Sequence, residues 1–167
     1  GFFLRIFNIG TDYYFSGESF TIPSGVTVDG NGSTIDFGAG AFQFLIQGTD
    51  AYAVGTISIN YGDTTVVGVG TTFTAAMVGR SILIGDYWYP ITGFTDATHI
   101  TIGFSFIGTN LSGDTYVIAT TVDAVRIQNI TLANSSTTLL KFRYVNGLNT
   151  DGLLCDTGAQ GIDGDDS

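Results

Sequence analysis

Glycine-containing breaks recur along this sequence at intervals of roughly eight to ten residues, between short runs of alternating apolar and polar residues. The first breaks are Pro23-Ser24-Gly25, Asp29-Gly30-Asn31-Gly32 and Gly38-Ala39-Gly40. Glycine and asparagine supply a positive φ there and proline a fixed one, so the chain bends or turns. The alternation between the breaks has the period of a half-buried strand. The pattern predicts many short strands, each three to five residues long.

Composition supports an all-β chain. The 167 residues include 24 glycines without a Gly-X-Y period, which excludes collagen, and 44% of the residues are hydrophobic, which excludes disorder. Glu18 and Lys141 are the only glutamate and lysine, so the residue types that cover exposed helices are missing. A helical protein is therefore excluded.

The net charge of −10 comes from 15 acidic and 5 basic residues, and all the acids except Glu18 are aspartate. A nucleic-acid partner is not expected, because no basic stripe exists to displace counterions from phosphates. No apolar run approaches the roughly 18 residues of a membrane-spanning helix, so no membrane span is expected.

Three segments differ in pattern. Residues 1–53 and 119–167 carry the short strands with glycine bends, which predicts the coils of a solenoid. Residues 54–118 carry longer alternating strands and one helical turn at 73–79, which predicts an inserted small antiparallel β-barrel. A shift of 18 residues places Gln128-Asn129-Ile130 over Asn146-Gly147-Leu148, and this predicts a coil of about that length.

The acidic residues are weighed as catalytic or metal-binding groups. A glycosidase needs two carboxyls close in space, and the clustered candidates are Asp163, Asp165 and Asp166, with Asp151 and Asp156 one coil away. Asp-Gly pairs more often build turns, and the spacing of a calcium loop is missing. We assign no catalytic, metal-binding or cofactor-binding residue and expect no cofactor.

Two other reactive side chains have structural interpretations. Cys155 follows the apolar residues Leu153 and Leu154. We therefore expect its side chain to be buried as a small apolar group and not to act as a nucleophile. The sequence has no second histidine and no cysteine near His99, so His99 can form neither a zinc site nor a catalytic triad. We expect it to be an exposed strand residue.

Aromatic residues provide the candidate contacts. Trp88 is expected in the core of the inserted segment with two tyrosines beside it, and the alternative is stacking on sugar rings. The candidate glycan contacts are Tyr87, Trp88 and Tyr89. The aromatic N-terminal stretch predicts an interface with sister chains or an adjoining domain; its residues are Phe2, Phe3, Phe7, Tyr13, Tyr14 and Phe15.

Residues 21–36 (TIPSGVTVDGNGSTID) resemble the opening coils of right-handed parallel β-helix proteins of the pectate-lyase type, and residues 129–132 (NITL) resemble a later coil. Residues 70–80 (GTTFTAAMVGR), 85–89 (GDYWY) and 97–102 (ATHITI) resemble a small β-domain found in phage tail and tailspike proteins. The resemblance implies an all-β fold in which a β-helix of few coils is interrupted by this small domain.

The resemblance also implies a function. We expect a structural and adhesive virion component that forms the proximal part of a homotrimeric phage tailspike or tail fibre. It would act outside the host cell, in attachment of the phage to its host. Its implied partners are other phage tail proteins and host surface polysaccharide. One alternative is the N-terminal part of a polysaccharide depolymerase with catalytic coils beyond Ser167, and another is a decoration or baseplate docking protein. We expect no enzyme activity in this segment, and we expect the chain to continue or to be covered by neighbours.

Overall fold

The computed structural model describes residues 2–5, 12–14, 19–156 and 160–164, with only the backbone placed at residues 2–5, 12, 14 and 160. The chain divides into two compact units: unit 1 comprises Gly1–Gly48 and Val122–Asp166, and unit 2 comprises Thr49–Thr121. The sequence placed these boundaries after residues 53 and 118. In the structure unit 2 begins earlier and ends later than these boundaries, because its first and last strands pair with each other.

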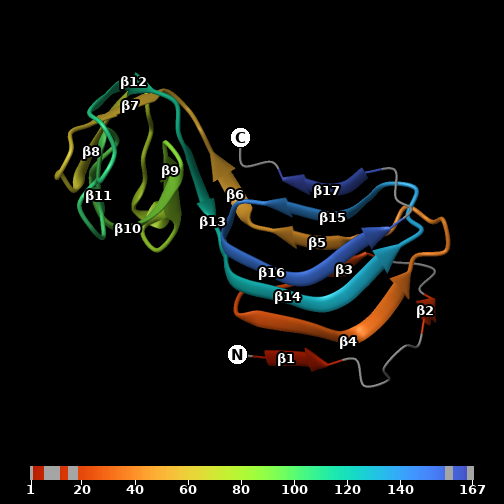
Figure 1. Cartoon of the computed structure of the whole chain (residues 1–167). Helices are drawn as coiled ribbons and strands as arrows, with labels where there is room; N and C mark the ends of the chain where they lie inside the picture. The colour runs from red at the N-terminus through yellow and green to blue at the C-terminus, as the bar shows by residue number, and fades with distance from the viewer. Residues whose placement is uncertain (1, 6–11, 15–18, 157–159, 165–167) are drawn as a thin grey trace. The chain divides into compact units, whose positions relative to one another are not determined.

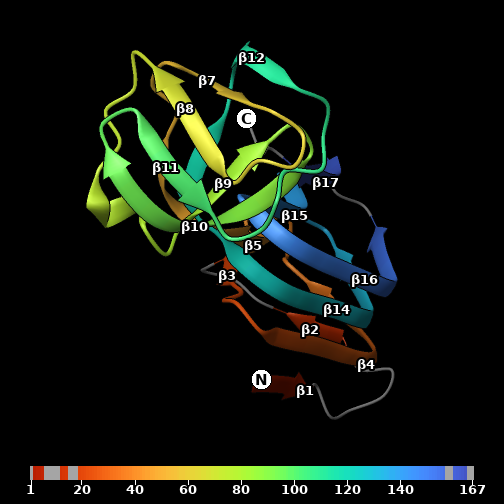
Figure 2. The ribbon, with the colours of Figure 1, turned by 90° about the vertical axis from the view of Figure 1, so that its left-hand side faces the viewer.

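Unit 1 is a parallel β-helix built from two sheets that the chain visits in turn (Figures 1 and 2). Every strand pair in both sheets is parallel. The first sheet contains β1 (Phe2–Arg5), β2 (Asp12–Tyr14), β4 (Val26–Asp36), β14 (Val122–Ala133) and β16 (Val145–Asp156), and the second contains β3 (Phe20–Thr21), β5 (Phe44–Gln47), β15 (Thr138–Arg143) and β17 (Gln160–Gly164). Coil 1 consists of β1, β2 and β3, coil 2 of β4 and β5, coil 3 of β14 and β15, and coil 4 of β16 and β17.

The strand register corrects the predicted coil length. Val122 lies beside Val145, 23 positions later, and Thr138 lies beside Gln160, 22 positions later. The predicted repeat of 18 is wrong, because the similar letters at 128 and 146 are not neighbours in the sheet. Asn146 pairs with Asp123 instead.

Strand length is the second correction. β4 spans 11 residues and β14 and β16 span 12 each, where strands of three to five residues were expected. The positive-φ residues bend these strands without ending them: φ is 51° at Asn31, 51° at Asn129 and 63° at Gly152. The parallel pairing continues on both sides of each bend. The break at residues 29–32 is therefore a bend inside a long strand, whereas the breaks at residues 23–25 and 38–40 do lie between strands.

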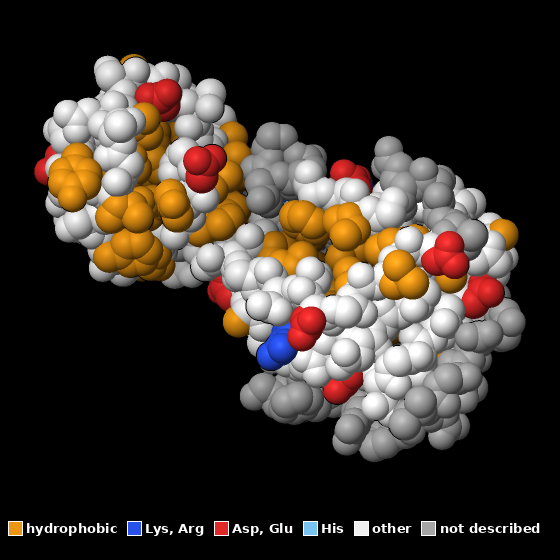
Figure 3. Space-filling model, in the orientation of Figure 1, with side chains coloured by type: hydrophobic (Ala, Val, Ile, Leu, Met, Phe, Trp, Pro, Cys, Tyr) orange, Lys and Arg blue, Asp and Glu red, His pale blue; other side chains and the backbone are white. Residues whose placement is uncertain are grey.

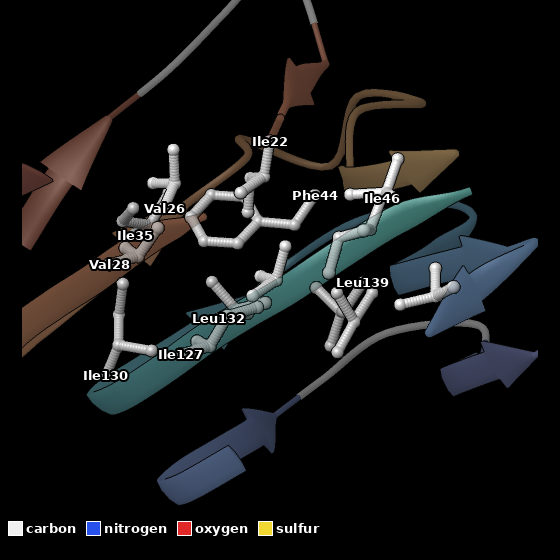
Figure 4. Close-up of a cluster of buried hydrophobic side chains, with 14 of the residues drawn as sticks. Ile22, Val26, Val28, Ile35, Phe44, Ile46, Ile127, Ile130, Leu132 and Leu139 are labelled. Carbon is white, nitrogen blue, oxygen red and sulfur yellow. The ribbon is translucent and has the colours of Figure 1, made fainter. Parts of the chain in front are cut away.

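Inward side chains stack in ladders from coil to coil and form the core of unit 1 (Figure 4). Ile35 lies in register with Leu132, and Phe44 with Leu140, and all four are at most 2% exposed. Phe44 also meets the ring of Phe37 edge to face, with centroids 6.3 Å apart. Burial of each such side chain contributes about 1.5–3 kcal/mol relative to an exposed one. Because each coil covers the apolar ladder of the previous coil, the stack is the source of unit 1's stability.

Unit 2 is an antiparallel sheet. Its strands are β6 (Thr49–Tyr52), β7 (Thr56–Ile59), β8 (Thr65–Val69), β9 (Ser81–Ile84), β10 (Tyr87–Asp96), β11 (His99–Ile102), β12 (Leu111–Asp114) and β13 (Val117–Thr120). Their order in the sheet is β12-β7-β8-β11-β10-β9-β13-β6, with β12 and β6 at its ends. β10 pairs with β9 through its first half and with β11 through its second half, so it links the two parts of the sheet. The predicted helical turn is the short 3₁₀ helix η1 (Ala75–Met77).

The core of unit 2 combines isoleucines from alternate strand positions with a group of aromatic rings. The rings of Phe73 and Tyr116 meet edge to face at 5.9 Å. Burial raises the pKa of Tyr116, and its hydroxyl donates to the Val54 carbonyl at 2.6 Å. Within the described residues, no helix is long and apolar enough to cross a membrane.

Candidate functional site

The aromatic residues at the start of β10 have very different exposures. Tyr89 is fully buried, Trp88 is half-buried and Tyr87 is 57% exposed. The alternation of the strand turns Tyr89 and Ile91 toward the core, which leaves Trp88 on the opposite face. The expectation that Trp88 forms the core is therefore wrong, because Tyr89 occupies that place. Of the three candidate glycan contacts, only Tyr87 and Trp88 have exposed surface.

Tyr89 holds the loop at residues 103–110 against the core. Its ring centroid lies 5.0 Å from that of Phe104 and 5.8 Å from that of Phe106, and its hydroxyl accepts a hydrogen bond from the Ile107 N–H at 3.3 Å. Phe106 is buried, but Phe104 is 50% exposed and Ile107 is 58% exposed. The loop thus presents two large apolar side chains on a supported backbone.

A second loop, between β7 and β8, is hydrogen-bonded to the loop at residues 103–110. The Tyr61 N–H donates to Asn110 Oδ1 at 2.8 Å, and the Gly62 N–H donates to the Phe106 carbonyl at 2.8 Å. Tyr61 is 71% exposed, the largest exposure among the described large apolar residues. We name Tyr61, Tyr87 and Phe104 the aromatic set. In Figure 3, apolar side chains gather on the visible face of unit 2, in the left part of the view.

Sequence reasoning missed Tyr61, Phe104 and Ile107 as surface residues. Each of them has a glycine beside it in the sequence, and the pattern does not mark which apolar residue of such a loop turns inward. Both phenylalanines contact Tyr89, and only the structure shows that Phe106 is buried while Phe104 is exposed.

The aspartates at the bends of unit 1 organise the backbone. Asp29 accepts a hydrogen bond from the Asn31 N–H at 3.0 Å and from Gln128 Nε2 at 3.1 Å. Asp36 accepts bonds from the Gly38 N–H at 2.7 Å and from Asn134 Nδ2 at 3.1 Å. Each carboxylate therefore shapes its own bend and also connects coil 2 to coil 3.

Among the other acidic candidates, Asp151, Asp156 and Asp163 lie on coil 4. Asp163 Oδ2 is 3.6 Å from Lys141 Nζ, and Asp151 Oδ2 is 3.7 Å from Arg126. Asp156 accepts a backbone bond from the Asn134 N–H through its carbonyl. Asp165 and Asp166 lie outside the described residues. In the described part of the chain, no three acidic, histidine or cysteine side chains are arranged to hold a metal ion.

His99 has a partner that the sequence analysis did not identify. Its Nδ1 lies 2.9 Å from Asp96 Oδ1, and the same oxygen accepts bonds from the N–H and hydroxyl of Thr98. The histidine hydrogen bond, then those from Thr98, lower the pKa of Asp96 to about 2. This group closes the turn between β10 and β11, as an aspartate-centred turn does.

Cys155 is half-buried, and burial raises the pKa of its thiol. It lies in register with Leu132 on the apolar ladder of unit 1. Its apolar position agrees with the structural interpretation, although its burial is incomplete.

The aromatic N-terminal stretch contributes coil 1. Phe2 and Phe3 lie in β1, and Tyr13 and Tyr14 lie in β2, and both strands pair with β4. Phe7 and Phe15 lie outside the described residues. The stretch thus has a backbone partner inside its own chain, which the sequence did not indicate.

No protein-family model and no curated protein sequence matches this chain. Three solved structures that resemble it are phage tailspikes. The Gp54 tailspike of Acinetobacter baumannii bacteriophage AP22, solved in complex with A. baumannii capsular saccharide, has a TM-score of 0.44 at 9% identity. The tailspike gp61 of Pseudomonas phage phi297 has a TM-score of 0.45 at 13% identity, and the tailspike protein gp49 of Pseudomonas phage LKA1 has one of 0.40 at 12% identity.

These similarities cover 96%, 96% and 94% of this chain, respectively, but only 32%, 38% and 32% of the tailspike chains. The chain therefore spans about a third of the length of the proteins it resembles.

Proposed function

We propose that this chain is a structural and adhesive component of a phage tail, the proximal part of a tailspike or tail fibre that takes part in host attachment. The observation that carries the proposal is the combination of a parallel β-helix with a complete antiparallel unit inserted between β5 and β14. The sequence resemblances imply the same combination in phage tail proteins. The proposal places the protein in the virion, as a homotrimer that acts outside the host cell.

Unit 2 is the part that we assign to contact with host surface polysaccharide. All three residues of its aromatic set are exposed: Tyr61 and Phe104 lie on hydrogen-bonded loops, and Tyr87 lies at the start of β10. Sugar rings present apolar C–H faces that pack against aromatic rings, while their hydroxyls remain in water. Rigid aromatic anchors of this kind lose little conformational entropy when they bind. In this proposal the segment has no catalytic step.

The test is a binding screen of the whole chain against purified bacterial capsular polysaccharides and lipopolysaccharides. We expect at least one polysaccharide to bind, and Tyr61→Ala and Tyr87→Ala each to weaken that binding about tenfold or more, as for contact residues at a binding centre. Val69→Ala is the matched control, because Val69 is 65% exposed on the same unit but is not aromatic. Failure of every tested polysaccharide to bind would contradict the adhesive role.

The same incubations separate adhesion from catalysis. New reducing ends or an unsaturated uronate signal would replace the adhesive proposal with the depolymerase alternative. A monomeric mass by light scattering at micromolar concentration would contradict the trimer.

A further inference from the structure

Each exposed tyrosine of the aromatic set lies on or beside a tight turn that also holds an aspartate. Tyr61 is the second residue of a turn from Asn60 to Asp63, which the Asp63 N–H closes by donating to the Asn60 carbonyl at 3.1 Å. Asn60 Nδ2 also donates to Asp63 Oδ2 at 3.0 Å, so the same turn positions the carboxylate. A carboxylate is therefore held two residues from Tyr61.

Tyr87 has a similar arrangement. Ile84 and Tyr87 are paired residues of β9 and β10, so Gly85 and Asp86 form a two-residue hairpin turn, with a φ of 61° at Gly85. Asp86 and Tyr87 are both exposed. A second carboxylate is thus held next to the second tyrosine.

The loop that carries Phe104 connects the two turns. Tyr87 and Tyr89 point to the same side of β10. The ring of Tyr89 contacts the rings of Phe104 and Phe106. The Phe106 N–H donates to the Asp63 carbonyl at 2.8 Å. Both turns are therefore connected to the loop of Phe104 by direct contacts.

Positive charge is scarce in unit 2. Residues 49–121 contain five aspartates, one arginine, no lysine and one histidine, which is paired with an aspartate. The arginine, Arg80, directly precedes β9, whereas the turn that holds Asp86 directly follows this strand. The guanidinium of Arg80 donates to the Asp50 carbonyl at 2.9 Å. A ligand anion at Tyr87 would therefore meet the Asp86 carboxylate and not the guanidinium.

We propose that the aromatic set binds uncharged capsular polysaccharide and that Asp63 and Asp86 exclude acidic polysaccharides. The inference rests on the proposed function and narrows its ligand class. The aromatic rings pack on the apolar faces of sugar rings, and the two carboxylates accept hydrogen bonds from sugar hydroxyls. A uronate or sialate carboxylate at the same place meets like charge, which lowers its affinity. The phosphates of a lipopolysaccharide core are repelled in the same way, so the occupant is capsule and not lipopolysaccharide.

The test measures binding of the full chain to a panel of capsular polysaccharides, each in two matched forms. Reduction of uronate carboxylates gives the uncharged form of an acidic polysaccharide, and oxidation of primary hydroxyls gives the charged form of a neutral one. We expect the uncharged form to bind about fivefold more tightly or better at about 0.01 M salt, and the ratio to fall at about 1 M salt, which screens exposed charges. Native lipopolysaccharide should bind more weakly than the uncharged capsular forms.

Two substitutions assign the selectivity to its residues. Asp63→Asn and Asp86→Asn keep a hydrogen-bond acceptor and remove the charge. Each should therefore raise the affinity for the charged form about twofold or more and leave that for the uncharged form unchanged. Asp151→Asn is the matched control: it removes the same charge from an exposed aspartate of unit 1 and should change neither affinity.

Charged forms that bind as tightly as the uncharged ones, or a selectivity that both asparagine variants retain in full, would overturn the inference and leave the adhesive function standing. Lipopolysaccharide that binds as tightly as the uncharged capsular forms would also overturn it. If no polysaccharide binds in any form, the proposed function fails too.

Discussion

At the scale of single residues, the preference for aspartate over glutamate has a geometric cause. The short side chains of Asp29 and Asp36 reach the N–H two residues ahead, and each carboxylate also accepts a hydrogen bond from a side-chain amide of the next coil. A glutamate is one methylene longer and does not form this turn. At these positions, therefore, an aspartate is required by the geometry of the bend.

Asp96 gives a pH-dependent prediction at this scale. Its pKa in the folded protein is about 2, below its ordinary value of 3.8, so the stabilisation is present above pH 3.8 and is lost as the pH falls through 2. Asp96→Asn keeps the acceptor for the Thr98 N–H but cannot titrate. We expect the wild-type melting temperature to fall more than that of Asp96→Asn between pH 5 and pH 2.

The fluorescence of Trp88, the only tryptophan, reports unit 2 in this experiment. Parallel pH profiles for the two proteins would show that the Asp96 group does not stabilise the turn.

At the scale of elements, long strands bend without losing their partners. The bend of β4 at Asn31 lies against that of β14 at Asn129, and the side chain of Asn129 approaches Asp29 Oδ1 at 3.4 Å. Side-chain hydrogen bonds thus replace the backbone pairing that is interrupted between Gln128 and Ile130. At this bend, side-chain hydrogen bonds to Asp29 connect coil 2 to coil 3, so we expect the stability of the bend to depend on Asp29.

Asp29→Ala tests these hydrogen bonds between coils 2 and 3. The substitution leaves the Asn31 N–H and the Gln128 and Asn129 amides without their acceptor, so we expect unit 1 to lose about 1–3 kcal/mol of unfolding free energy. Asp151→Ala is the control: it removes an exposed ion pair with Arg126 and should change stability by about 0.5 kcal/mol or less. Urea unfolding followed by circular dichroism measures both, and equal effects would refute the role of Asp29.

At the scale of the whole molecule, unit 2 is inserted in the sequence between coils 2 and 3 of unit 1. Within unit 1, the Gly48 N–H donates to the Arg143 carbonyl at 2.9 Å and the Val122 N–H donates to the Tyr144 carbonyl at 3.0 Å. The two ends of the insertion are therefore anchored to consecutive residues. Phe44 pairs with Leu140, 96 positions later, and removal of the 73 residues of unit 2 leaves 23, the spacing of Val122 and Val145.

Deletion of residues 49–121 should therefore leave a β-helix that folds. We expect the joined protein, with Gly48 followed by Val122, to give a β-sheet circular dichroism spectrum and a cooperative thermal transition. Deletion of residues 49–122 is the matched control, because one residue fewer reverses the inward and outward faces of the following strand. An unfolded 49–121 deletion would show that unit 1 needs unit 2.

The sequence by itself determined the all-β class, the change of pattern near residues 53 and 118 and the turn role of aspartate, because these follow from local backbone preference and side-chain reach. Only the tertiary structure decided the strand lengths and the coil length, which is 22–24 residues between coils that unit 2 does not separate. The reason is that a positive-φ residue ends a strand or only bends it according to what lies beside it. It also decided that Tyr89 and not Trp88 is buried, since the alternation of a strand leaves open which of its two faces meets the core. The structure also shows that Leu132 and Cys155 are neighbours, which the sequence could not indicate because they are distant in sequence and meet only through the stacking of coils.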